Sequence, residues 1–171
     1  MIREIITYPN KLLRTKSKDV EEINSELHTL LDDMYETMIA ASGVGLAAIQ
    51  IAVPLNVLII NPINEEDIQD KNDLIEAINP KITHKDGELV YQEGCLSVPG
   101  FYEDITRAKH IVVEYFNRFG EKQTMECEDF LAVAWQHEME HLSGHVFIEN
   151  LSFTKRQKFE KEWKNRKKSK K

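Results

Sequence analysis

The chain has 171 residues, of which 42% are hydrophobic and 30% are charged, and its net charge at neutral pH is −7. These values are typical of one soluble globular domain spanning residues 1–171, and they exclude a disordered or fibrous chain. The start, MIREIITYPN, has no long apolar stretch, and no apolar run in the chain is long enough to cross a bilayer. We therefore expect a cytoplasmic protein with no membrane partner. Two cysteines are too few for a disulfide framework.

Positive charge is concentrated at the C-terminal end. Residues 155–171 hold ten Lys or Arg and two Glu, a net of +8, so residues 1–154 carry −15 of the total of −7. An acidic body argues against a broad nucleic-acid surface, and we expect no DNA partner. The basic tail, from about residue 152, could contact an anionic partner such as RNA, or it could be a solvated helix end.

The first predicted element is a helix from about residue 25 to 41. Its apolar residues recur at helical spacing, Asn24 or Ser25 can cap its start, and Gly43 can end it. The middle of the chain is rich in residues that suit strands. Strands are predicted over residues 55–60, 74–80 and 110–116 and in the following KQTMECE, with an acidic loop at 64–73 and a turn at 117–121.

Two further helices are predicted near the C-terminus. One begins near Asp129 and should stop at Gly144. The other begins at about Ser152 and holds the basic tail, with Phe159 and Trp163 one turn apart as its docking face. Strands gathered between helices at the two ends indicate an α+β fold.

The segment AWQHEMEH in the second of these three helices contains an H-E-x-x-H motif. Four residues advance a helix by about 400° and roughly 6 Å, so His137 and His141 project from nearly the same face and can reach one metal ion. Glu138 is rotated by about 100° from His137, outside the coordination sphere but close enough to act as a general base. The flanking residues are apolar, and unpaired histidines would be costly in such a helix. The motif therefore predicts a metal site.

The third ligand decides the class of enzyme. The extended pattern with a third histidine fails, because Phe147 stands at the position in question. Glu160 and Glu162 lie downstream but inside the basic tail. Cys127 is too far away if it shares the helix, by about 15 Å along the axis. Cys95, in QEGCLSVPG, can present a thiolate to a helix packed across from it, although a small buried cysteine is the simpler interpretation of that residue alone.

Three segments occur in order along the chain: GVGLAAIQ (43–50), EGCLS (93–97) and QHEMEH (136–141). Together they resemble the three motifs of the peptide deformylase family, hydrolases that remove the formyl group from the N-terminal methionine of new bacterial polypeptides. The resemblance covers nearly the whole chain. Ile49 stands where many members have proline and Glu140 where aspartate is frequent, but neither position carries the chemistry. The resemblance implies an α+β fold in which antiparallel sheets pack around the motif helix.

The resemblance also assigns a task to each motif residue. Cys95, His137 and His141 would hold one divalent ion, with a fourth position left for water, and Glu138 would move the proton. The side-chain amide of Gln50 and the backbone N–H of Leu96 would stabilise the developing oxyanion. The remaining residues would bind substrate: Gly45 where the peptide backbone runs close, Val44 and Gly94 as partners of an added strand, and Val133 and Ala134, with Val44, as lining of a methionine pocket.

The identity of the metal and of the partners is likewise implied by the resemblance. A Cys/His/His set suits zinc or ferrous iron. The family implies Fe(II) as the native ion, with Zn, Ni or Co able to replace it, and N-formylmethionyl nascent peptides as substrates. The basic tail is then expected to contact the ribosome. Two alternatives share the motif: a zinc endopeptidase, and a non-enzymatic metal-stabilised module that binds RNA and has four protein ligands.

Overall fold

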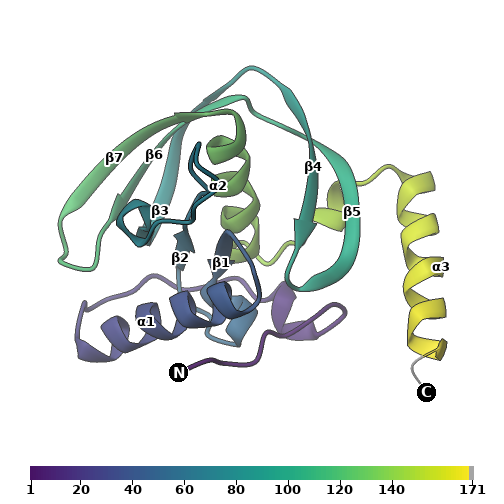
Figure 1. The fold of residues 1–171 in the computed structure, drawn as a ribbon, viewed down its shortest axis with the longest axis horizontal. Helices are drawn as coiled ribbons and strands as arrows, with labels where there is room; N and C mark the ends of the chain where they lie inside the picture. Colours follow the sequence, from purple (N-terminus) through teal and green to yellow (C-terminus); the bar gives the residue numbers. More distant parts are fainter. Residues whose placement is uncertain (170–171) are drawn as a thin grey trace.

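A five-stranded antiparallel sheet and a separate two-stranded hairpin enclose a central helix in the computed structural model, which describes residues 1–169 (Figure 1). The sheet consists, in spatial order, of β1 (Gly45–Ala47), β2 (Val57–Ile60), β3 (Ile75–Asp86), β6 (His110–Phe116) and β7 (Lys122–Glu128), and the hairpin consists of β4 (Leu89–Cys95) and β5 (Val98–Arg107). The α-helices are α1 (Ser25–Ala40), α2 (Asp129–Leu142) and α3 (Phe153–Ser169), and 3₁₀ helices span Lys11–Arg14, Ala48–Ile51, Lys71–Asp73 and Phe147–Asn150. The predicted α+β fold with antiparallel sheets is confirmed.

Strand β2 explains how the sheet holds a helix on each face. All four of its residues are buried, so it reads as a continuous apolar run rather than an alternation. Leu58 and Ile60 pack in one cluster with Trp135 of α2, whereas Val57 and Ile59 pack in another with the apolar residues of α1. The sheet therefore packs against the central helix α2 on one face and against α1 on the other.

The predicted ends of α1 and α2 agree closely with the structure. Asn24 caps α1, because its side chain accepts a hydrogen bond from the N–H of Leu27. The residue with positive φ after α1 is Ser42 rather than Gly43, which corrects the predicted stop signal. Helix α2 ends one residue before Ser143, and Gly144 follows with φ +83°, as the sequence predicted.

Neither the β4–β5 hairpin nor the short strand β1 was predicted from the sequence. The strands of the hairpin expose most of their side chains, and their buried positions mix the charged residues Glu93 and Arg107 with the apolar Val98 and Ile105, so no regular apolar alternation marks them. Figure 1 shows the hairpin on the opposite side of α2 from the five-stranded sheet. This placement brings the end of β4 against the face of α2 that carries the histidines.

Helix α3 docks on the outer side of the hairpin, as Figure 1 shows at the right. Phe159 is fully buried in a third apolar cluster with Phe147 and Val98, and Trp163 packs at its edge. The docking face predicted from Phe159 and Trp163 is thus confirmed. No helix within residues 1–169 is both long enough and apolar enough to cross a membrane.

Candidate metal centre

Three metal-type donors converge between the hairpin and the central helix. Cys95 is the last residue of β4, and His137 and His141 lie one turn apart on α2. The donor atoms of these three side chains all lie within 4.8 Å of one another. The Cys95 Sγ is 3.3 Å from the Nε2 of His141, and both histidines are buried. The structure therefore brings together the three residues that the sequence singled out as ligands.

The end of the hairpin is shaped so that Cys95 can face α2. Gly94 pairs with Tyr102 across the hairpin, and the register then shifts so that Cys95 pairs with Val98. A Cβ at position 94 would lie 2.5 Å from the Tyr102 ring, closer than atoms can approach. A side chain larger than that of glycine before Cys95 would therefore displace the exposed Tyr102 ring.

A buried carboxylate, which the sequence analysis did not assign a role, orients His137. The Oε1 of Glu93 lies 2.8 Å from the Nδ1 of His137. The same carboxylate accepts two hydrogen bonds of 2.8 Å from the Arg107 guanidinium. This guanidinium also donates a hydrogen bond to the Glu140 carboxylate of α2. The only feature of the sequence that pointed to Glu93 was its place in the EGCLS segment, two residues before Cys95. The Nε2 of His137 is left to face the cluster, as second-shell carboxylates commonly arrange for a ligating histidine.

Burial and neighbouring charges set the protonation of this network. Burial disfavours the charged forms of Glu93 and Arg107, but their mutual hydrogen bonds outweigh it, so the pKa of Glu93 is lowered and that of Arg107 is raised. Burial holds the pKa of His141 well below its usual value, which keeps that imidazole neutral. A neutral imidazole is the form that binds metal.

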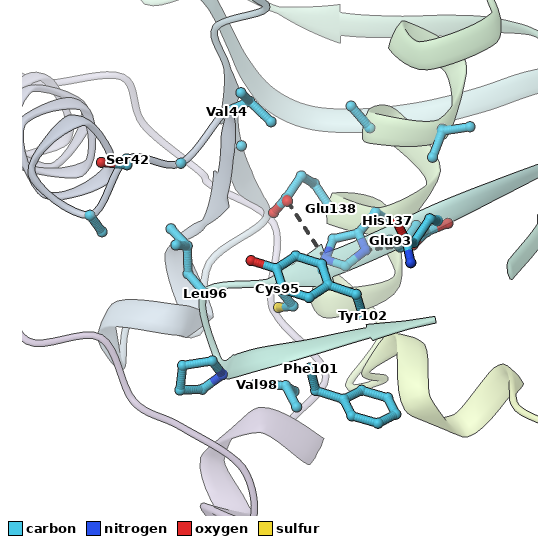
Figure 2. Close-up of a pocket in the computed structure, with 18 of the residues that line it drawn as sticks. Ser42, Val44, Glu93, Cys95, Leu96, Val98, Phe101, Tyr102, His137 and Glu138 are labelled. Carbon is cyan, nitrogen blue, oxygen red and sulfur yellow. Dashed lines mark hydrogen bonds and ion pairs between the residues drawn. The ribbon is translucent and has the colours of Figure 1, made fainter. Parts of the chain in front are cut away.

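Glu138 lies beside the cluster rather than in it, as its position on the helix predicted. Its Oε1 is 4.0 Å from the Nε2 of His137, and burial raises the pKa of the Glu138 carboxyl to about 7. Figure 2 shows the carboxylate of Glu138 and the sulfur of Cys95 both beside the His137 ring. A Cβ at Gly45 would lie 2.9 Å from the Glu138 Oε1, so this glycine leaves room for the carboxylate itself.

The donor set fits a divalent ion of the zinc or ferrous type. One thiolate and two imidazoles are ligands that both ions accept. A buried polar atom beside the donors, the Oε2 of Glu138, has no hydrogen-bond partner within the described part of the chain. Such orphaned groups are costly in a protein interior unless a ligand or water completes them. The residues present therefore fit a divalent metal ion of the kind that the sequence resemblance implies.

A cavity of about 470 Å³ opens beside the three donors. Its lining includes all the residues predicted to bind substrate or to stabilise the oxyanion, namely Val44, Gly45, Gln50, Gly94, Leu96, Val133 and Ala134. Aromatic side chains that the sequence analysis did not predict, among them Tyr91, Tyr102 and Phe130, complete the wall. The carbonyl of Val44 already accepts a hydrogen bond from the Asn61 N–H. The cavity is thus a mostly apolar pocket that ends at the metal-type cluster.

Gln50 is buried at the base of this pocket with its amide held in one orientation. Its Oε1 accepts a hydrogen bond from the Ala47 N–H at 2.9 Å, and its Nε2 donates to the Ser97 hydroxyl at 3.1 Å. The Nε2 also lies 3.7 Å from the Cys95 Sγ. The amide N–H₂ is therefore directed toward the cluster. Leu96 follows Cys95 directly and lines the pocket.

The other residues considered as ligands lie elsewhere. Cys127 is buried in β7 within the core of the sheet, where burial raises the pKa of its thiol to about 11. Glu160 lies on α3 and accepts a hydrogen bond from the Tyr8 hydroxyl. Glu162 is an exposed residue of the same helix. None of the three joins the Cys95 cluster.

Comparisons with known proteins agree with one another. A sequence profile described as polypeptide deformylase matches residues 2–157. A peptide deformylase of Campylobacter jejuni is 57% identical over 170 residues, which cover 99% of this chain and 97% of the relative, and one of Helicobacter pylori strain G27 is 53% identical over 168 residues, 98% of this chain and 97% of the relative. The crystal structure of a peptide deformylase from Legionella pneumophila superimposes with a TM-score of 0.92 at 38% identity, covering 99% of this chain and 98% of that one.

Proposed function

The chain belongs to the polypeptide deformylase family, whose members remove the N-terminal formyl group from peptides, and we propose that the pocket beside α2 carries out this reaction. The observation that supports the assignment to this pocket is the convergence of Cys95, His137 and His141 at the end of a cavity. A zinc endopeptidase, the alternative that shares the H-E-x-x-H helix, finds no support in the comparisons.

The metal ligands are proposed to be Cys95, His137 and His141, and the ion ferrous iron, with zinc, nickel or cobalt as substitutes. When bound, such an ion acidifies water and polarises a carbonyl group. Glu93 holds the Nδ1 of His137, so that Nε2 is directed toward the ion. The low pKa of the neutral His141 and the convergence of a thiol support the same set.

Glu138 is proposed as the proton carrier. Its buried carboxyl has a pKa of about 7, so it can take a proton from the attacking water and return it to the departing amine at neutral pH. Gln50 and the backbone N–H of Leu96 are proposed as donors to the formyl oxygen as charge develops on it. The hydrogen bond from Ala47 to the Gln50 Oε1 supports this role, because it turns the amide N–H₂ toward Cys95.

The substrate is proposed to be the N-formylmethionyl end of a nascent peptide. Val133 and Ala134 of α2 and Val44 offer an apolar wall for the methionine side chain. Val44, Gly45 and Gly94 lie on the rims of the two sheets that face the pocket, where an extended peptide can pair as an added strand. Residues 1–171 are proposed to form one catalytic domain acting in the cytoplasm.

The direct test compares formyl-methionyl and acetyl-methionyl peptides with metal-loaded protein. We expect formate release from the first and little turnover of the second. Glu138→Gln keeps the volume of the side chain but cannot carry a proton, so kcat/KM should fall by at least about 100-fold, the scale of a lost general acid–base. Metal content of the variant is the control and should stay unchanged. Full activity of Glu138→Gln would refute the proposed role.

The basic end of α3 is proposed to contact the ribosome, the place where these substrates emerge. Phe159 and Trp163 face the body of the protein, so a deletion from residue 155 would also remove a core residue. Charge reversal of Lys164, Lys167 and Lys168 avoids this, because all three are exposed. Ribosome binding by this triple variant should weaken and lose its salt dependence, while turnover of a short formyl peptide stays normal. Unchanged ribosome binding would contradict the contact.

A further inference from the structure

A second group of metal-type donors lies at the far end of the five-stranded sheet, outside the pocket. His84 and Asp86 are two residues apart near the end of β3, and His110 begins β6 opposite Asp86. Their donor atoms all lie within 4.8 Å of one another. From this geometry we propose that His84, Asp86 and His110 form a binding site for a second divalent ion of the zinc class.

The register of the strands places the three side chains on one face. Side chains two residues apart share a face of a strand, and directly paired residues of neighbouring strands share it too. Asp86 pairs with His110, and His84 pairs with Val112 two residues further along β6. This face is the outer one, because Ile111 and Val113 point into the core. The donors are therefore carried by paired strands, which hold them more rigidly than a loop would.

The contacts within the group have the form of a metal site. The Asp86 Oδ2 lies 2.5 Å from the Nε2 of His84 and 3.0 Å from the Nδ1 of His110. The two rings meet edge to face with their centroids 5.8 Å apart. Two imidazole nitrogens thus converge on one carboxylate oxygen. Two imidazoles and a carboxylate are a ligand set that suits Zn²⁺ and its neighbours among the divalent metals.

A fourth side chain supports the assignment of ligand atoms. The Glu126 Oε1 of β7 lies 2.6 Å from the Nε2 of His110, the ring nitrogen that points away from the group. A ligating histidine usually donates its second N–H to a carboxylate, which fixes the tautomer and leaves the other nitrogen free for the ion. Glu126 is in the position to do this for His110. The site would therefore use the Nδ1 of His110, the Nε2 of His84 and the Asp86 carboxylate.

The site lies where the chain leaves the sheet for the hairpin. Asp86 is the last residue of β3, just before β4, and His110 follows β5 after two residues. Figure 1 shows these two connections crossing together at the top of the molecule. An ion held here would join both strands at the base of the hairpin that carries Cys95 and Glu93. It would stabilise the connection between the sheet and the hairpin. The deformylase reaction itself does not require such an ion.

The experiment counts zinc bound to the full-length protein. The protein is first loaded with Zn²⁺ and then dialysed against micromolar free Zn²⁺ at pH 7.5, and the ions per chain are measured by native mass spectrometry. We expect two ions for the unmodified chain and one for His84→Ala and for His110→Ala. The matched control is His145→Ala, which removes an exposed histidine paired with Glu149 elsewhere and should keep two. Glu126→Gln should weaken the second ion about 10- to 100-fold.

Two further readouts separate this site from the pocket. The second equivalent of zinc should raise the thermal midpoint of the unmodified chain but not that of His110→Ala. Turnover of a formyl peptide should be the same in the unmodified chain, His84→Ala and His110→Ala, since neither His84 nor His110 lines the pocket. One ion per unmodified chain, or two ions retained in both alanine variants, would overturn the proposal. The first result would mean that the imidazoles are held only by protons shared with the carboxylates.

Discussion

At the scale of single residues, a relay of charged contacts ties the ligand geometry to the body of the protein. Glu140 of α2 contacts Arg107 at the end of β5, Arg107 holds Glu93 with two hydrogen bonds, and Glu93 holds His137. The sequence could predict the ligands, because two histidines at helical spacing and a cysteine in a recognisable segment carry their own signal. It could not predict this relay, because Arg107 lies 14 residues from Glu93 in a hairpin without apolar alternation.

Glu93→Gln tests the relay. The neutral amide is a weaker acceptor for the Nδ1 of His137, so metal affinity should fall about 10- to 100-fold, as it does when second-shell carboxylates are removed. Competition with a coloured chelator measures the affinity. Glu88→Gln, at an exposed position just before the same strand, is the matched control and should bind metal normally. Equal metal affinities in Glu93→Gln and Glu88→Gln would show that Glu93 does not contribute to metal binding.

Gly45→Ala tests the space reserved for Glu138. The added methyl carbon would lie 2.9 Å from the Glu138 Oε1, so the carboxylate must move. Misplacement of a reacting group by about 1 Å can cost on the order of 100-fold in rate. We therefore expect kcat for the formyl peptide to fall by about ten- to 100-fold while metal content stays at the original level. An unchanged kcat would show that Glu138 does not need this position.

At the scale of elements, patterns were predictive where one face of an element is apolar. Helix α2 and strand β6 were predicted at nearly their observed bounds, because their apolar residues repeat at the helical and strand periods. Strand β3 was predicted too short, since its second half is exposed and polar. The β4–β5 hairpin gave no such pattern, because most of its side chains are exposed and two of its buried positions, Glu93 and Arg107, are charged. The sequence therefore predicted the helices and strands of the core, but not the hairpin that supplies Cys95 to the site.

Phe159→Ala tests how α3 is attached. Phe159 is fully buried between the hairpin and the 3₁₀ helix that follows α2, so its truncation should cost about 3–5 kcal/mol of unfolding free energy. Phe153→Ala on the same helix is the matched control, because Phe153 is 78% exposed and its loss should change stability by less than about 0.5 kcal/mol. Urea denaturation followed by circular dichroism gives both values. Similar stabilities for the two variants would mean that α3 is not packed on the core.

At the scale of the whole molecule, the site depends on two units, the five-stranded sheet and the β4–β5 hairpin, that meet at α2. The five-stranded sheet supports α2 from one side, and the hairpin brings Cys95 from the other. A metal held by one residue of the hairpin and two of the helix would therefore join the two halves. Family membership follows from the sequence as a whole, whereas the joining of these halves could be seen only in three dimensions.

The most direct test of this account is a titration of metal-free protein with ferrous iron under anaerobic conditions, with formate release from a formyl-methionyl peptide as the readout. We expect activity to rise in proportion to added iron and to level off at one ion per chain, while Cys95→Ala shows no rise over the same range. Turnover that does not depend on added metal, or that iron restores equally well in Cys95→Ala, would contradict the proposed centre.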